Sequence, residues 1–141
     1  MGNSEQAEKI LDIIPKCMRC IRAEMRAIED SDLSIPQFRI LVYLAKNEVS
    51  TNKDLANWLG VTTPTMTRMI DLLVKRNLVE RVQNSKDRRE IQLKITKEGR
   101  KKYLHRRSKV QDNLAKKVSG LSLSQQDTLI QGLQILEDIF S

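Results

Sequence analysis

The sequence predicts a mainly α (α+β) fold, in which a winged helix-turn-helix unit with a small antiparallel wing lies between N- and C-terminal helices. Three observations predict it. Residues 51–77 hold two short helix patterns joined by a glycine turn, and residues 78–95 hold two alternating strand patterns joined by a polar loop. An apolar stripe also marks each end of the chain. Because 141 residues with 40% hydrophobic content suit one domain, we expect a single domain, with the winged unit at 35–98 and flanking helices at 1–34 and 99–141.

The first element is a helix over residues 5–29, because apolar side chains recur there at steps of three or four. The stripe consists of Ala7, Leu11, Ile14, Met18, Ile21, Met25 and Ile28. It needs a partner surface, supplied either by the rest of the chain or by another subunit. Pro15 lacks a backbone donor, so the helix is either kinked near Asp12 or divided into two shorter helices.

The second element is a helix over residues 36–46, with Pro36 at an early helical position. This helix supports the two that follow it. Its predicted buried face consists of Phe38, Leu41, Val42 and Ala45.

A helix-turn-helix pair comes next. Thr51 caps its first helix, and Asp54 completes a capping box three residues later. Gly60 supplies the left-handed residue that ends this helix, and Thr62 caps the next one. The residues of the first helix expected to face inward are Leu55, Ala56 and Leu59.

The second helix of the pair displays short hydroxyl groups and one long base on its outer face. Its buried residues are predicted to be Met66, Met69, Ile70 and Leu73, which leaves outside Thr63, Pro64, Thr65, Thr67, Arg68 and Asp71. Threonine can bond base edges or phosphates, and arginine can make a bidentate contact to guanine. The first-turn amides add a phosphate site. Thr62 and Thr65 could equally serve only as capping residues, although capping and phosphate contact are compatible.

The wing is predicted from alternating apolar residues on either side of the polar loop QNSKDRRE. The strand residues are Leu78, Val79 and Val82 before the loop, and Ile91, Leu93 and Ile95 after it. Asp87 precedes Arg89 by two residues, so its carboxylate can hold the guanidinium by charge-assisted hydrogen bonds. Narrow A·T minor grooves attract such an arginine. The alternative is a salt-bridged turn with no ligand.

Two further helices complete the chain. One covers about residues 97–118, opens at Thr96 and ends near Gly120, and its apolar contacts are expected to be Leu104, Leu114 and Val118. The last helix carries Leu129, Leu133, Leu136 and Phe140, preceded by Ser124 and Asp127 in a capping-box arrangement. The two terminal stripes either pack within one chain or form a dimerisation region. Periodicity alone leaves these readings about even, and dimeric reading of paired half-sites favours the dimer.

The net charge of +7 is unevenly distributed. Residues 75–109 hold 14 bases against 4 acids, a window of +10, which leaves the rest of the chain at −3 with 11 bases and 14 acids. A localised basic band favours contact with a polyanion, and the DNA backbone is the commonest one. The alternative is that these bases only form the solvent-exposed face of a helix.

Other classes of function find little support in the sequence. His105 is the only histidine, and neither a phosphate loop nor metal-ligand spacing is present, so we expect no enzyme, no cofactor and no metal. Cys17 and Cys20 lie three residues apart on one helix and form no disulfide framework. No apolar run approaches the ~20 residues of a membrane span, and the polar start lacks a secretory signal. A cytoplasmic protein without a membrane partner is expected.

The chain resembles the MarR family of winged helix-turn-helix transcriptional regulators over nearly its whole length. The resemblance is carried by PQFRIL, TNKDLANWLGVTTPTMTRMIDLLVKRNLVER and SKDRREIQLKITKEG, in that order between terminal helices. It implies that Arg89 is the wing-tip arginine of the minor groove, that Asp87 orients it, and that residues 63–68 include the recognition-helix contacts. The expected DNA-binding residues are Thr62, Thr63, Pro64, Thr65, Thr67, Arg68, Lys75, Arg76, Arg81, Ser85, Lys86, Asp87, Arg88 and Arg89.

The resemblance also implies how such a protein works. Members typically act as homodimers on pseudo-palindromic operators, often as repressors released by small phenolic ligands or oxidants. We therefore expect terminal dimerisation helices, and a small phenolic or other hydrophobic effector that changes the separation of the two reading heads, which must match half-sites ~34 to 36 Å apart. Asn77 stands where the family usually has glycine, and asparagine also visits the left-handed region.

Three rival functions remain open at this stage. Redox sensing through Cys17 or Cys20 is one, although the family's peroxide-sensing branch uses tyrosine partners and Tyr43 is the only candidate nearby, and buried helix cysteines are usually inert. A winged helix used only for protein contacts is another. The third is nonspecific architectural DNA binding. RNA recognition is disfavoured by an aromatic content of 4%.

Overall fold

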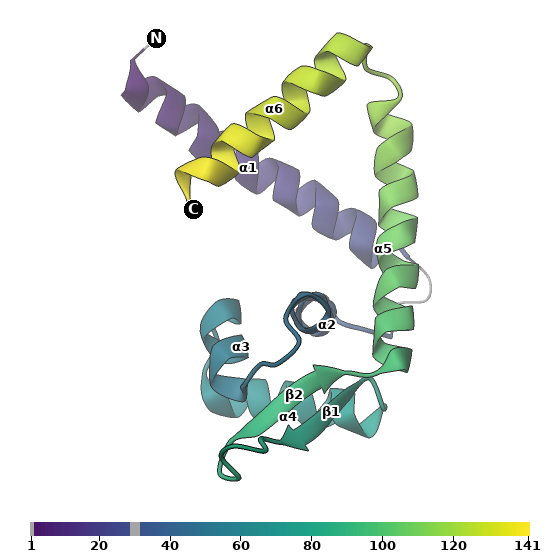
Figure 1. Ribbon diagram of the computed structural model, residues 1–141. Coiled ribbons are helices and arrows are strands. Elements are labelled where there is room, and N and C mark those ends of the chain that lie inside the picture. The colour runs from purple at the N-terminus through teal and green to yellow at the C-terminus, as the bar shows by residue number, and fades with distance from the viewer. Residues whose placement is uncertain (1, 29–31) are drawn as a thin grey trace.

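The computed structural model describes residues 2–28 and 32–141. Helices dominate it, and the two strands form one antiparallel sheet, so the predicted fold class is confirmed. In chain order the elements are α1 (Asn3–Arg26), α2 (Ile35–Lys46), α3 (Asn52–Leu59), α4 (Thr63–Lys75), β1 (Val79–Gln83), β2 (Ile91–Ile95), α5 (Lys97–Val118) and α6 (Leu123–Ile139). Figure 1 shows α2, α3, α4 and the two strands together at one end of the molecule, with α5 leading from them to α6, which passes in front of α1 in this view.

The hydrophobic core lies among α2, α3, α4 and the sheet. Its fully buried side chains include Ile40, Leu41, Leu44, Leu55, Met66, Ile70, Leu73 and Leu93. On α2 the predictions of Phe38 and Leu41 are confirmed, but Val42 and Ala45 are only half-buried. Ile40 and Leu44 were missed because α2 contacts α1, α3, α5 and β2, so more than one of its faces is covered.

The helix-turn-helix caps follow the predicted pattern. The Thr51 hydroxyl accepts a hydrogen bond from the Asp54 N–H at 3.1 Å, and the Asp54 carboxylate accepts one from the Thr51 N–H at 3.2 Å. Gly60 adopts a φ of 75°, which places it in the left-handed region and ends α3. Leu55 and Ala56 are buried and Leu59 is half-buried. These local signals determine where α3 ends and the direction in which α4 leaves the turn.

The wing is a two-stranded sheet that a third segment extends. Val79 pairs with Ile95 and Gln83 with Ile91. The Leu93 N–H donates to the Ser50 carbonyl at 2.7 Å, which attaches the wing to the segment before α3. The sheet is therefore fastened to the helix-turn-helix at its base, and the loop at its tip is free of that attachment.

The N-terminal helix is continuous through Pro15, so of the two alternatives the division into two helices is excluded. It ends at Arg26, and Glu29, the last residue of the expected helix, lies outside the described residues. Ile28 is buried as expected, whereas Leu11 is 73% exposed. Much of the predicted stripe therefore has no cover within the described chain.

Two expectations for the C-terminal helices are wrong. Thr96 does cap α5, accepting from the Gly99 N–H at 3.0 Å, but Leu104 is exposed, and Tyr103 and Arg106 are the buried residues instead. The cap of α6 is Ser122, whose capping box uses Gln125, and not Ser124 with Asp127. Ser122 comes directly after the turn that ends α5, and glutamine is a preferred third residue of such a box.

Candidate nucleic-acid interface

The outer face of α4 carries the residues predicted to read DNA. Thr62, Thr63, Pro64, Thr65 and Arg68 are all exposed, and Lys75 is exposed two turns beyond Arg68. The Thr62 hydroxyl accepts from the Thr65 N–H at 3.3 Å and donates to the Thr65 hydroxyl at 2.9 Å. The predicted capping role of Thr62 is therefore confirmed. Because Pro64 has no N–H and that of Thr65 is used by the cap, the first-turn amide that remains for an anion is that of Thr63.

Thr67 differs from its neighbours on α4 because it is half-buried. Its hydroxyl accepts from the Asn52 side-chain amide at 2.7 Å and donates to the Thr63 carbonyl at 3.0 Å. This hydroxyl fastens α4 to the first turn of α3, so it is occupied in the free protein. Asn52 was not predicted, since its partner lies 15 residues away and no local pattern joins the two.

The loop between β1 and β2 displays a cluster of exposed polar side chains, Ser85, Lys86, Asp87, Arg88 and Arg89. The Asp87 carboxylate accepts from the backbone N–H of Arg89 at 3.0 Å. Within the described residues Asp87 bonds this backbone N–H and not the Arg89 guanidinium, so its orienting role toward a groove stays a prediction. An Asx-type turn of this kind shapes the loop, and the Arg89 side chain is exposed.

Arg81 on β1 forms an ion pair with Asp71 on the outer face of α4. The wing is thereby joined to α4 beside the residues that project from that helix. Arg81 was predicted as a DNA contact, and in the free protein its charge is already engaged.

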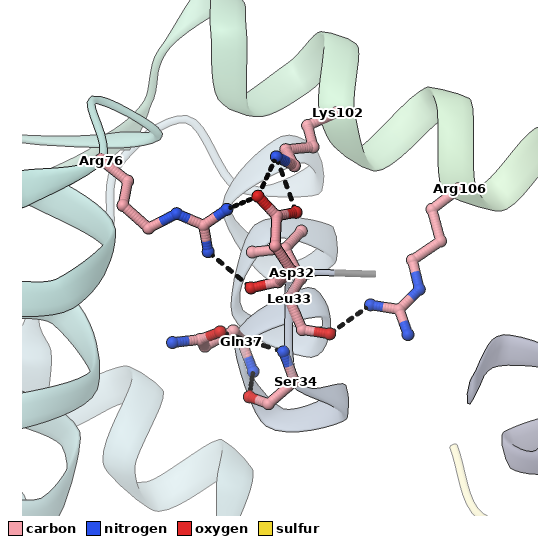
Figure 2. A network of polar contacts seen from close by, with 7 residues as sticks. All are labelled: Asp32, Leu33, Ser34, Gln37, Arg76, Lys102 and Arg106. Atoms are coloured by element: carbon pink, nitrogen blue, oxygen red, sulfur yellow. Dashed lines mark hydrogen bonds and ion pairs between the residues drawn. The ribbon is translucent and has the colours of Figure 1, made fainter. Parts of the chain in front are cut away.

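Arg76 also has a partner within the chain, in a network drawn in Figure 2. Its Nη1 donates to the Asp32 carbonyl at 2.8 Å, and its Nη2 pairs with the Asp32 carboxylate. Lys102 of α5 donates to the same carboxylate, with Nζ 2.7 Å from Oδ1. The hydrogen bond from Lys102 lowers the pKa of Asp32 most, and the charges of Arg76 and Lys102 add to this, while partial burial opposes it.

Arg106 of α5 is a buried cation, with an exposed fraction of 3%. Its guanidinium donates to the Leu33 carbonyl at 2.7 Å and to the Met25 carbonyl at 2.9 Å, and it lies 5.2 Å from the Phe38 ring. Burial lowers the pKa of Arg106, and the negative charge of Asp32 opposes that shift. Arg106 therefore joins α5 to the end of α1 and to the segment before α2.

The bases of residues 75–109 therefore fall into two groups, those bonded inside the protein and those exposed at its surface. Arg76, Lys102 and Arg106 hold elements together, and α5 runs from the sheet toward α6 (Figure 1). The bases that remain exposed on α4 and the wing loop are Arg68, Lys75, Lys86, Arg88 and Arg89.

An apolar pocket of about 450 Å³ lies where α1, α2 and α5 meet. Its floor is apolar, and Arg107 and Gln111 supply polar groups. The lining residues are Ile21, Met25, Phe38, Arg107, Val110, Gln111, Leu114, Ala115 and Val118. A pocket that is mostly apolar with a few polar groups suits a small aromatic or amphipathic molecule.

Other kinds of site find no support in the described part of the chain. Across residues 2–28 and 32–141, no group of His, Cys, Asp and Glu side chains could hold a metal ion. Within the same ranges, no helix is both long and apolar enough to cross a membrane. Cys17 and Cys20 are free and exposed in the described chain.

Comparison with known proteins agrees with this geometry. A model of the MarR family matches residues 33–91, which contain α2, the helix-turn-helix and the wing loop. The chain is 36% identical over 76 residues to the HTH-type transcriptional regulator FarR of Neisseria gonorrhoeae, covering 54% of this chain and 52% of FarR. It is 29% identical over 119 residues to the uncharacterized HTH-type transcriptional regulator YpoP of Bacillus subtilis, covering 84% of each. The chain spans about half the length of the first of these relatives.

Solved structures extend the likeness to the whole molecule. A MarR family protein from Bacillus stearothermophilus matches with a TM-score of 0.89 and covers 99% of both chains at 18% identity, a likeness of fold alone. The chain is therefore a winged helix-turn-helix protein. Its central unit, residues 33–91, is similar to the MarR family.

Proposed function

We propose that the chain is a DNA-binding transcriptional regulator that reads a duplex with α4 and its wing loop. The single observation that carries the proposal is that one compact unit exposes both the outer face of α4 and an arginine-rich loop, joined by the Arg81–Asp71 pair. A helix of this kind fits a major groove, and the loop then reaches the adjacent minor groove. The match of residues 33–91 to the MarR family model supports this assignment.

The exposed residues divide by the kind of contact each can make. Arg68 has the geometry for a bidentate contact to guanine, and Thr65 can bond a base edge or a phosphate. Lys75 and Lys86 are suited to phosphates, and Arg89 to a narrow minor groove. Arg76 and Arg81 are proposed to act mainly through their partners inside the protein, because their charges are already paired.

The test is selection of bound duplexes from a random pool, which reports half-site sequence, symmetry and spacing together. Arg68→Ala is expected to cost about 1 to 3 kcal/mol of affinity for the selected operator and to relax base preference at one position. Arg89→Ala is expected to weaken binding, most of all at A·T-rich flanks. The measurement is the operator affinity of each variant at fixed salt concentration.

Arg19→Ala, which removes an exposed base from α1, is the matched control and should change little. If neither Arg68→Ala nor Arg89→Ala weakens binding, the winged unit serves protein contacts instead. If the pool shows no enrichment over random duplex, the protein binds DNA only nonspecifically.

The working unit is proposed to be a homodimer formed by α1 and α6. Both helices expose large apolar side chains to an extent unusual for a monomer, among them Leu11, Ile13, Ile130, Leu133 and Phe140. A second copy of the chain would cover them and set two reading heads at a fixed distance. Pseudo-palindromic operators match that symmetry.

We propose that the pocket between α1, α2 and α5 holds a small phenolic or other hydrophobic effector. It lies between the proposed dimerisation helices and the winged unit, so a ligand there would bias their relative position. Arg107 can pair with an acidic group on the ligand. Operator affinity titrated with aromatic acids tests this, and an effector-bound protein with unchanged affinity would contradict it. Repression is the proposed direction of control, and a reporter gene under the selected operator decides whether the protein represses or activates.

A cytoplasmic location stays a prediction from the sequence.

A further inference from the structure

Asp32 lies where three parts of the molecule meet (Figure 2). On one side Arg76, the C-cap residue of α4, reaches it with two nitrogens, one to the backbone carbonyl and one to the carboxylate. The Arg76 side chain is only 29% exposed. The C-cap of the proposed DNA-reading helix is therefore attached to the segment that leads into α2.

On the other side α5 grips the same segment twice. Lys102 contacts both carboxylate oxygens of Asp32, at 2.7 and 2.8 Å. Arg106, one turn further along α5, bonds the carbonyl of the next residue, Leu33. Residues 32 and 33 thus connect α4 to α5, although Asp32 is 44 residues from Arg76 and 70 from Lys102.

We infer that Asp32 is a positioning residue for operator binding, which fixes the angle between α4 and α5 without touching DNA. The inference rests on the proposed function, because it names the device that aligns the DNA-reading helix with the dimerisation helices. In a dimer the position of α4 relative to α5 decides whether both α4 helices meet successive grooves.

The charges explain why one carboxylate has this effect. An isolated exposed ion pair contributes little, but here a single carboxylate stands against Arg76, Lys102 and the buried Arg106. Replacing it with a neutral amide leaves like charges facing one another and turns one of its two acceptor oxygens into a donor group. The expected response is a shift in the position of the C-terminal end of α4 relative to the segment before α2.

The decisive variant is Asp32→Asn, measured against the duplex selected above and against random duplex. General electrostatics predicts tighter binding to both, since a negative charge is lost. The inference predicts the opposite for the operator, an affinity about tenfold lower, with random-duplex affinity unchanged or higher. Glu98→Gln, which removes an acid that lines the same groove as Arg76 and Lys102, is the matched control and should not weaken operator binding. An operator affinity that is unchanged or higher in Asp32→Asn overturns the inference.

A double variant separates positioning from a phosphate contact by Arg76. If Arg76 acts through Asp32, the variant Asp32→Asn with Arg76→Met binds the operator no more weakly than the weaker single variant. The slope of affinity against salt concentration also stays at the wild-type value in each, because no phosphate contact is lost. Losses that multiply, or a shallower slope in Arg76→Met, overturn the inference.

Hydrogen exchange without DNA gives a readout that does not depend on the proposed function. The amides of Arg76, Asn77 and Leu78 bond to carbonyls of α4. They should exchange faster in Asp32→Asn, while the amides of α3 keep their wild-type rates. Unchanged exchange at residues 76–78 overturns the inference. A wild-type protein that binds no duplex refutes the proposed function alone, and the exchange rates still decide the role of Asp32.

Discussion

Asn77 ends α4 in a left-handed conformation, with a φ of 60°. The Leu78 N–H bonds the Leu73 carbonyl and the Asn77 N–H bonds the Val74 carbonyl, both at 2.9 Å, which is the pattern of a Schellman cap. The sequence predicted that asparagine could take this conformation, and the prediction is confirmed. The turn directs the chain from α4 into β1, so its geometry sets where the wing begins.

The strain at Asn77 can be measured by substitution. Asn77→Gly is expected to raise the free energy of unfolding by a few tenths up to about 1 kcal/mol, because glycine takes positive φ without a Cβ clash. Asn77→Ala is expected to lower it by about 1 kcal/mol. Urea denaturation of the two variants and the wild type checks the order. An alanine variant as stable as the wild type would contradict it.

At the scale of single elements, most local signals were read correctly and distant contacts were not. The caps at Thr51, Gly60, Thr62 and Thr96 depend on residues within a few positions, so the sequence contains all that determines them. The buried face of α2 depends on which elements surround it, and periodicity favours one face only. The cap of α6 was predicted at Ser124, but Ser122 carries the same hydroxyl group two residues earlier and forms the cap.

The residues of the candidate interface also divide into those that the sequence could predict and those that it could not. The exposed residues of α4 and the wing loop could be predicted, because amphipathic patterns show which side of an element faces outward. Thr67 and the Asp32 network could not, because Asn52, Arg76 and Lys102 meet their partners only in the folded chain. A basic residue in a sequence shows its charge and not whether an acid will neutralise it.

The junction of β1 and α5 requires a residue without a side chain. A Cβ built on Gly99 would lie 2.1 Å from the Leu78 carbonyl oxygen, which already accepts from the Thr96 N–H at 3.1 Å. Gly99→Ala is therefore expected to lower the free energy of unfolding by about 2 kcal/mol or more, despite the better helix propensity of alanine. Gly132→Ala in α6, where nothing lies within 4 Å, is the control and should be neutral or stabilising. Denaturation at matched protein concentration compares them, and equal effects would contradict the close approach.

At the scale of the whole molecule, the winged unit has a core and the terminal helices do not. No residue of α1 or α6 is classed as buried within the described chain, and both helices carry apolar side chains along one side. A pocket of about 440 Å³ between their ends is lined by residues such as Ile10 and Phe140. Such a surface is costly to leave in water, so assembly of two chains supplies the core that one chain lacks.

Leu133→Glu tests that assembly. Leu133 is 49% exposed on α6, and a buried carboxylate facing its symmetry mate would be expensive to desolvate and repelled by like charge. Sedimentation equilibrium is expected to give twice the chain mass for the wild type and a mass near 16.3 kDa for the variant at micromolar concentration. Gln134→Glu introduces the same charge at an exposed polar position of α6 and should remain dimeric. The operator affinity of Leu133→Glu should fall to the affinity of one subunit for one half-site, because the two DNA-binding units are no longer linked. A wild type of single-chain mass, or a Leu133→Glu variant that stays dimeric, would show that these helices do not form the interface.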